Sequence, residues 1–238
     1  MARQANSRDA AAAAHTDDAV GPRVVPRAIR IAPTGLEGLL SLPEPAIGIV
    51  LFAHGSGSSR LSPRNKYVAE ALQSAGLATL LFDLLTDSEA ADRARVFDIP
   101  LLAERLLMAT EWTARRHETV TLPLGYFGAS TGAAAALVAA ARSDREIAAV
   151  VSRGGRPDLA DAALRRVRSP TLLIVGGADH AVLDLNRAAL VRLNCEKRLS
   201  VVPGATHLFE EPGTLDKVIE LARDWFLDHI PVGKGEAA

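Results

Sequence analysis

Short apolar runs alternate with amphipathic or alanine-rich stretches along most of the chain. The apolar runs are rich in Val, Ile, Leu and Phe, as buried strands are, whereas the stretches between them have helical length and composition. Strand and helix in repeated alternation predict an α/β domain with a mainly parallel sheet covered by helices on both faces. The eight predicted strands lie at 27–32, 36–42, 47–55, 78–85, 120–128, 147–155, 171–179 and 199–207.

The first two runs predict a hairpin, and every later run is followed by a stretch with helical character. Only about 15 residues separate the run that ends at 155 from the next, enough for one helix and no separate lid domain. We therefore expect one domain over 24–231, an open site, a disordered tail at 1–23 and a flexible tail at 232–238. The predicted helices lie at 62–76, 99–117, 131–142, 158–167, 183–193 and 214–230.

The composition is that of an ordinary globular protein and excludes several classes. Lys and Arg number 27 against 28 Asp and Glu, a balance that offers no support for a nucleic-acid partner. Cys195 is the only cysteine, which excludes an internal disulfide and a multi-cysteine metal site and fits a reducing compartment. No long apolar run predicts a membrane span or a signal peptide, so we expect a cytoplasmic protein.

One serine stands between two glycines where a strand-like run gives way to a helix-like run. Residues 125–136 read GYFGASTGAAAA, with Ser130 at the centre and Gly128 and Gly132 two residues to either side. A tight strand-to-helix turn strains its central residue and crowds the neighbours, so glycine is needed at both positions. The pattern predicts that Ser130 is a nucleophile on a sharp turn, although a serine at an ordinary helix start would match it too.

A serine nucleophile needs an imidazole to take its proton and a carboxylate to orient that imidazole. Of the six histidines, His54 precedes a glycine-rich turn, which suits loop shaping, whereas His207 follows the last predicted strand. Asp179 ends the run before it and is the preferred acid, because Ser130, Asp179, His207 is the chain order expected for this turn. Asp184 is the nearest alternative but could cap a helix that starts near Leu185.

The developing oxyanion of an acyl-transfer reaction needs hydrogen-bond donors. The backbone N–H of Thr131 follows the nucleophile at a helix N-terminus, and the N–H of Ser56 or Gly57 in the HGSG stretch is the second candidate. Asp83, at the end of the fourth strand, is a weaker candidate acid that could instead fix a loop.

Four arginines follow predicted strands at the same edge of the sheet, and one or two of them could bind an anionic group of a substrate. More often such arginines are solvated or paired with local carboxylates. They are Arg60, Arg64, Arg153 and Arg156, and we take Arg60 and Arg153, with His54, as the candidate substrate contacts.

Four stretches, FAHGSGSS, GYFGASTG, VGGAD and GATHLF, resemble in this order the motifs of the α/β-hydrolase superfamily, and within it the dienelactone hydrolase-like group. The resemblance covers roughly 24–231. The chain is also similar to hydrolase domains that are fused to phosphoribosyltransferase domains. Dienelactone hydrolases proper carry cysteine at the nucleophile position, where this chain has Ser130, and this difference favours a general serine esterase over a lactonase.

These observations together predict a serine hydrolase that needs no metal or cofactor and cleaves a small ester, thioester or lactone through an acyl-enzyme on Ser130. Its expected partner is a small-molecule substrate. Two other classes stay open: a catalytically silent hydrolase fold that binds a ligand, and a nucleotide-binding α/β protein. The second ranks low because neither G-x-x-x-x-G-K-[ST] nor G-x-G-x-x-G occurs.

Overall fold

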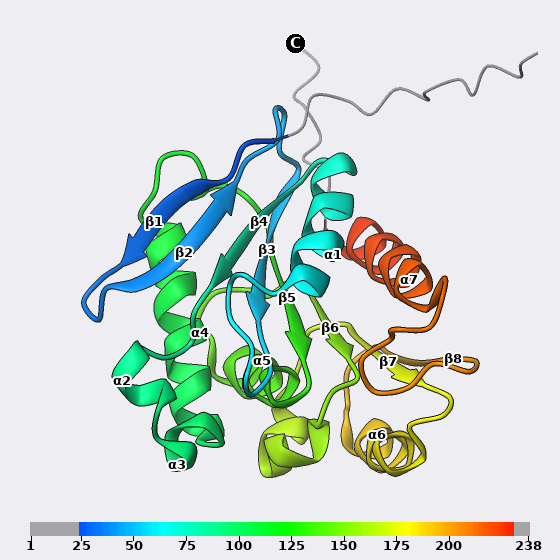
Figure 1. Cartoon of the computed structure of the whole chain (residues 1–238). Helices are drawn as coiled ribbons and strands as arrows, with labels where there is room; N and C mark the ends of the chain where they lie inside the picture. Colours follow the sequence, from blue (N-terminus) through cyan, green and yellow to red (C-terminus); the bar gives the residue numbers. More distant parts are fainter. Residues whose placement is uncertain (1–23, 231–238) are drawn as a thin grey trace, which may run out of the picture.

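The computed structural model describes residues 24–230, and the tails predicted at 1–23 and 232–238 lie outside these described residues. The described residues form an eight-stranded sheet, in the order β1-β2-β4-β3-β5-β6-β7-β8, between two layers of helices (Figure 1). The connection between β6 and β7 holds one short helix, η1. The predicted α/β fold class, with about eight strands and no separate lid domain, is confirmed over this part of the chain.

The sheet is antiparallel at one edge and parallel elsewhere. Strands β1 and β2 form the predicted hairpin, and β2 also runs antiparallel to β4, whereas the other neighbouring strands pair parallel. The carboxyl ends of the parallel strands therefore meet at one edge, where open α/β sheets place their ligands. The strands are β1 (Arg27–Ile31), β2 (Leu36–Ser41), β3 (Gly48–Ala53), β4 (Leu77–Phe82), β5 (Leu124–Ala129), β6 (Ala149–Arg153), β7 (Thr171–Gly176) and β8 (Lys197–Val202).

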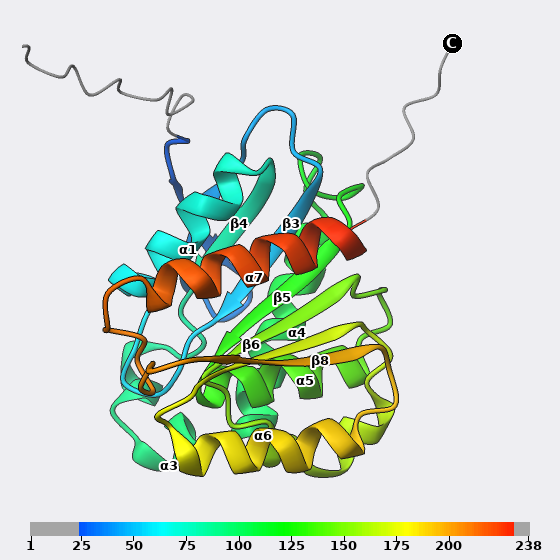
Figure 2. The same ribbon diagram turned by 90° about the vertical axis from the view of Figure 1, so that its right-hand side faces the viewer.

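Both faces of the sheet are buried under helices. Helices α1 (Pro63–Ser74) and α7 (Thr214–His229) cover one face, as Figure 2 shows. The other face packs against α4 (Ile99–Ala114), α5 (Thr131–Arg142), α6 (His180–Arg192) and η1 (Pro157–Arg166).

Successive side chains of the central strand β3 enter opposite layers, as the period of two in a strand requires. Ile49 and Leu51 join the core beneath α4 and α5, whereas Val50 and Phe52 pack with α1 and α7. This double burial explains why the central strands are continuous apolar runs rather than alternating ones.

Several helical segments differ from the sequence expectation. The segment predicted as a helix at 158–167 is a 3₁₀ helix kinked at Asp161, whose φ of 41° breaks the helical path. Helix α6 begins at His180 rather than at 183. Two short helices that the sequence did not indicate, α2 (Asp87–Ala90) and α3 (Arg93–Val96), precede α4. Within residues 24–230, no helix has both the length and the apolar character needed to cross a bilayer.

Candidate active site

Ser130 occupies the sharp turn between β5 and α5, with φ 51° and ψ −122°. A positive φ is strained for a non-glycine residue, and such strain persists only where the surroundings impose it. A Cβ added at Gly128 would lie 2.5 Å from the Cα of Ala133, and one at Gly132 would lie 2.1 Å from the carbonyl oxygen of Ala53. The two glycines therefore let α5 lie directly against the ends of β5 and β3.

Asp179 and His207 come together beyond two neighbouring strands. The Nδ1 of His207 lies 2.7 Å from the Oδ2 of Asp179. Asp179 directly precedes α6 but its side chain makes no capping hydrogen bond, so the carboxylate is available to the imidazole. Because Nδ1 faces the carboxylate, the other ring nitrogen, Nε2, is left to face a substrate or a nucleophile.

Asp184, the alternative acid, lies within α6 and pairs with Arg187 at 3.0 Å. Since α6 begins at His180, the expected capping role of Asp184 near Leu185 is wrong.

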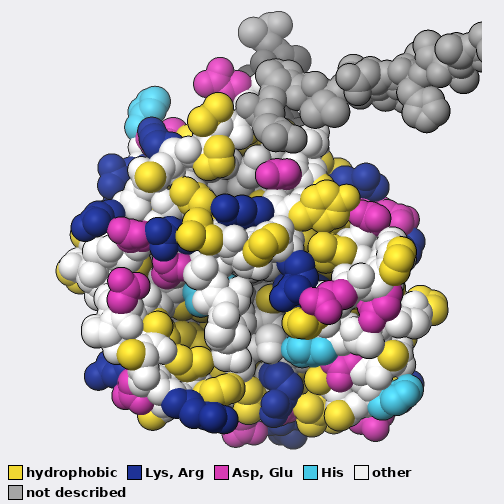
Figure 3. Space-filling model, viewed as in Figure 1, with side chains coloured by type: hydrophobic (Ala, Val, Ile, Leu, Met, Phe, Trp, Pro, Cys, Tyr) yellow, Lys and Arg dark blue, Asp and Glu magenta, His cyan; other side chains and the backbone are white. Residues whose placement is uncertain are grey.

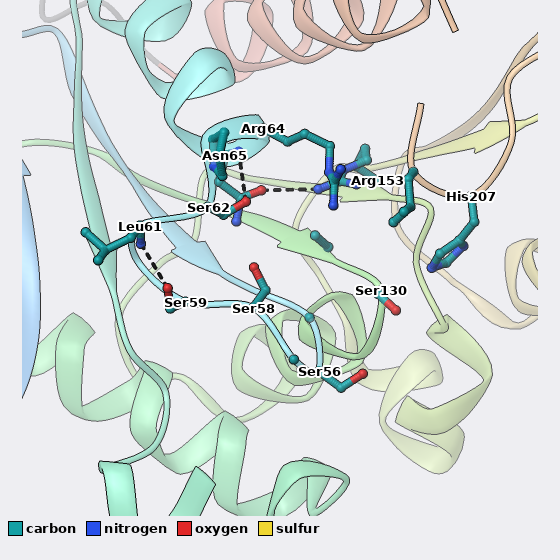
Figure 4. A pocket seen from close by; sticks show the side chains of 15 residues that line it. Ser56, Ser58, Ser59, Leu61, Ser62, Arg64, Asn65, Ser130, Arg153 and His207 are labelled. Carbon is teal, nitrogen blue, oxygen red and sulfur yellow. Dashed lines mark hydrogen bonds between the residues drawn. The ribbon is translucent and has the colours of Figure 1, made fainter. Parts of the chain in front are cut away.

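Ser130 and His207 line the same cavity, which has a volume of about 610 Å³. Figure 4 shows both side chains at one side of this cavity, with the Ser130 hydroxyl and the His207 ring next to each other. Among the described residues no hydrogen bond joins Ser130 Oγ to the ring, and such contacts are often long without a substrate.

The loop that carries His207 is held by close backbone packing. Phe209 has a φ of 56° and is 2 % exposed, so its ring anchors the loop in the core. A Cβ added at Gly154 would lie 3.0 Å from the carbonyl oxygen of His207. A bulkier residue at 154 would therefore displace the histidine loop from the end of β6.

The candidate oxyanion donors are linked through a side chain. Thr131 is the first residue of α5, so its N–H has no carbonyl partner within the helix. The N–H of Ser56 donates to Thr131 Oγ1 at 3.0 Å. Gly57 has a φ of 70° in the turn closed by the hydrogen bond from Ser58 N–H to the Gly55 carbonyl. The N–H of Ser56 is therefore already used, whereas those of Thr131 and Gly57 have no hydrogen-bond acceptor among residues 24–230.

His54 is held by two backbone hydrogen bonds rather than by the Ser130 cavity. The N–H of Leu84 donates to its Nε2 at 3.1 Å, so Nδ1 carries the proton and donates to the Gly55 carbonyl at 3.0 Å. Burial lowers the pKa of His54, which favours this neutral form. The ring lines a neighbouring cavity of about 220 Å³. His54 thus fixes this loop and does not line the cavity with Ser130, and its substrate contact stays a prediction.

Arg60 is also committed to neighbours of its own. Its guanidinium pairs with Asp83 and Glu37, and the backbone N–H of Arg60 donates to Asp83 Oδ1 at 2.7 Å. Its side chain lines the neighbouring cavity but not the one with Ser130. Asp83 thereby fixes the glycine-rich loop, and the substrate contact of Arg60 stays a prediction.

The other three arginines differ in what they face. Arg64 and Arg153 line the cavity with Ser130. Arg156 pairs with Asp158 through two hydrogen bonds of 2.8 and 2.9 Å and is not part of the lining. Of the two arginines chosen from the sequence as substrate contacts, Arg153 lines the cavity with Ser130 and Arg60 lines the neighbouring one.

Two positions in the cavity lining were not found by sequence reasoning. Asn65 is 3 % exposed and accepts a hydrogen bond from Arg153 Nη2 at 3.2 Å. Ser62 caps α1, accepting from the N–H of Asn65 at 3.4 Å, and lines the cavity. The Ser-Pro pair at 62–63 is a helix-start signal and could have placed this N-terminus beside the site.

Charges on the outer surface are mixed, and no metal cluster is evident. Figure 3 shows acidic and basic side chains interspersed on the face it presents, without a large area of either sign. Among residues 24–230, no group of three or more His, Cys, Asp or Glu side chains is arranged to hold a metal ion.

The fold and this site define a class. A mainly parallel sheet, a strained serine on the turn after β5 and a His–Asp pair beyond β7 and β8 are the features of an α/β-hydrolase fold. The model of the dienelactone hydrolase family matches residues 36–225, and the chain belongs to that family.

The curated relatives are longer than this chain. Two proteins of Mycobacterium tuberculosis, from strains CDC 1551 / Oshkosh and H37Rv and each named "Putative phosphoribosyl transferase", are 57% identical over 225 residues. The alignment covers 94% of this chain and 51% of each relative, so the chain spans about half their length. Their name agrees with the similarity to hydrolase domains fused to phosphoribosyltransferases.

Solved structures share the architecture. A dienelactone hydrolase from Anabaena variabilis is 55% identical, with a TM-score of 0.85 over 88% of this chain and 100% of that one. Est1E from Butyrivibrio proteoclasticus is 17% identical, with a TM-score of 0.72 over 85% and 98%. An α/β serine hydrolase without a lid from Xanthomonas campestris is 22% identical, with a TM-score of 0.71 over 87% and 96%. At such identities the last two show the fold alone.

Proposed function

We propose that the protein is a serine hydrolase that cleaves a small carboxylic ester, thioester or lactone through an acyl-enzyme on Ser130. The observation that carries the proposal is the strained Ser130 in one cavity with His207, whose Nδ1 lies 2.7 Å from Asp179. A serine, a base and an orienting acid in this order are the parts that nucleophilic acyl transfer needs.

The first half of the reaction forms the acyl-enzyme. His207 Nε2 takes the proton of Ser130 Oγ while Oγ bonds to the substrate carbonyl carbon, whose π electrons move to the oxygen. That oxyanion accepts hydrogen bonds from the N–H groups of Thr131 and Gly57. Asp179 holds the imidazolium that results. The intermediate then collapses, and the leaving alcohol or thiol takes the proton from His207.

Water completes the cycle. His207 takes a proton from a water molecule as its oxygen attacks the acyl carbon, and the second intermediate releases Ser130 Oγ, which regains a proton from the imidazolium. The products are the carboxylic acid and the alcohol or thiol. The chain's own residues and water supply every group in this scheme.

Mass analysis after treatment with a fluorophosphonate tests the nucleophile, because this reagent traps an activated serine. We expect one adduct, on Ser130, that is lost in Ser130→Ala and forms far more slowly in His207→Ala. Ser74→Ala, which removes an exposed serine on α1, serves as the matched control and should label as the wild type does. A folded protein without an adduct would favour the silent, ligand-binding form of this fold.

A further inference from the structure

Arg153 is a buried cation without a carboxylate partner among residues 24–230. Its residue is 6 % exposed, Nη2 donates to Asn65 Oδ1 at 3.2 Å, and Nε has no hydrogen-bond partner within residues 24–230. Burying a charge is costly unless it is paired. Burial, together with the nearby charge of Arg64, lowers the pKa of Arg153 to about 10, so the side chain is still cationic at neutral pH.

This cation lies beside the nucleophile. Arg153 ends β6, and its carbonyl accepts the N–H of Ser130 at 3.3 Å. Figure 4 shows its guanidinium at the rim opposite the glycine-rich loop, next to Arg64. Ser130 and Arg153 line the same cavity, so a substrate bound there can reach both residues together.

The cavity lining contains two cations and no anion. Arg64 has one carboxylate neighbour, Glu210, at 3.0 Å, and that side chain is 62 % exposed outside the lining. Hydroxyl groups supply much of the remaining wall.

The start of α1 adds to the positive potential. Ser62, Pro63 and Asn65 line the cavity, so the N-terminus of this 12-residue helix borders the space that Arg153 faces. Helix N-termini favour anions through their unpaired N–H groups and the helix dipole. The helix terminus and the guanidinium, which donates to Asn65 of the same helix, favour the same kind of ligand.

We propose that Arg153, with Arg64 and the N-terminus of α1, binds an oxyanion group, a carboxylate or a phosphate, on the substrate whose ester reacts at Ser130. This proposal rests on the proposed hydrolase function and names its substrate class: anionic esters. A guanidinium at the cavity wall with no carboxylate partner among residues 24–230 offers an oxyanion a charge-assisted contact that a neutral ester cannot make.

Three esters of equal length test the proposal: methyl 4-phosphonobutanoate, monomethyl glutarate and methyl pentanoate. Their affinities are measured by calorimetry with Ser130→Ala, so that binding is separated from turnover. We expect at least one anionic ester to bind about tenfold to a hundredfold more tightly than methyl pentanoate. The tighter of the two anions identifies the phosphate or the carboxylate as the group recognised.

Variants on the Ser130→Ala background assign the preference to Arg153. Arg153→Met should reduce the ratio of anionic to neutral affinity to about one, and Arg153→Lys should keep part of it. Arg156→Gln, whose side chain pairs with Asp158 outside the cavity, is the matched control and should keep the full ratio. If Arg153→Met does not fold, the affinities of the three esters for Ser130→Ala and for its Arg153→Lys variant still test the proposal.

The proposal is overturned if methyl pentanoate binds as tightly as both anions, if neither anion binds at millimolar concentration, or if Arg153→Met keeps the preference. Turnover by the wild type separates the two hypotheses. Anion preference without turnover of any ester contradicts the hydrolase function and leaves the anion site in place. Turnover of methyl pentanoate without anion preference supports the hydrolase function and contradicts the anion site.

Discussion

A single methyl group added at position 132 tests whether α5 must lie against β3 for the serine turn to form. The Cβ of Gly132→Ala would lie 2.1 Å from the Ala53 carbonyl oxygen and 2.5 Å from that of His54. Ordinary contacts begin near 3.4 Å, so the helix start has to move by about 1.3 Å. Both neighbours are backbone atoms of a central strand and its loop, which cannot rotate away as a side chain could.

The cost follows from that displacement. Overpacking costs about 1–3 kcal/mol, and rigid backbone on both sides places this site near ~3 kcal/mol. Alanine is a better helix former than glycine by about 1 kcal/mol, which offsets part of the loss. We therefore expect the free energy of unfolding to fall by about 2 kcal/mol. A misplacement of ~1 Å can also cost about a hundredfold in reaction rate, so labelling of Ser130 should slow by about that factor.

Urea unfolding and fluorophosphonate labelling measure the two effects on the same variant. Gly213→Ala is the control, because its added Cβ meets nothing within 4 Å, its φ is 77°, and residue 213 does not line the cavity with Ser130. That variant should lose about 1–2 kcal/mol through backbone strain and label at the wild-type rate. Wild-type stability and labelling in Gly132→Ala would refute the close approach of α5 to β3.

Three further variants probe the site. Asp179→Asn should slow labelling of Ser130 by about a thousandfold or more with the fold intact, because the imidazole loses its orienting anion; normal labelling would contradict this role. Thr131→Val removes the oxygen that accepts the Ser56 N–H and should lower kcat about tenfold while Thr131→Ser keeps it, and equal kcat values for both would count against the link. The pKa of His54 is lower in the folded protein, so near and below pH 6.5 the unfolded chain binds more protons than the folded one. The free energy of unfolding should therefore fall as the pH drops below about 6.5, by at most ~1.4 kcal/mol per pH unit. His54→Asn should show a shallower fall in urea titrations between pH 7.5 and 5, and an unchanged slope would assign the effect to other groups.

Sequence reasoning succeeded where local chemistry decides the outcome. Buried parallel strands have to be apolar on both faces, so the apolar runs at 47–55 and 171–179 predicted β3 and β7. The serine turn was equally readable, because Gly128 and Gly132 are required by contacts within a few residues or with the adjoining strand.

It succeeded less well where contacts distant in the chain decide. Nothing in the sequence near Arg60 indicates that it pairs with Asp83 and Glu37, because these partners are distant in the chain. Asp83 comes directly after β4, and Glu37 lies in β2. The two hydrogen bonds of His54 depend in the same way on where the chain after β4 passes. Arginines after strands look alike in sequence, and only folding shows that Arg153 faces the cavity while Arg60 does not.

The His207–Asp179 contact depends on the register of β7 and β8. Gly176 pairs with Val202 at the end of these strands, and the two functional residues lie a few positions beyond that pair. A Cβ added at Gly176 would lie 2.3 Å from the carbonyl oxygen of Ala205, so the histidine loop lies directly against β7. A slip of one residue in this pairing would move His207 by about 3.3 Å along the strand. The 2.7 Å hydrogen bond between His207 and Asp179 would then be broken. The acid–base pair and the register of this edge of the sheet therefore have to form together, and a substitution that weakens the β7–β8 pairing should reduce reactivity before it unfolds the protein.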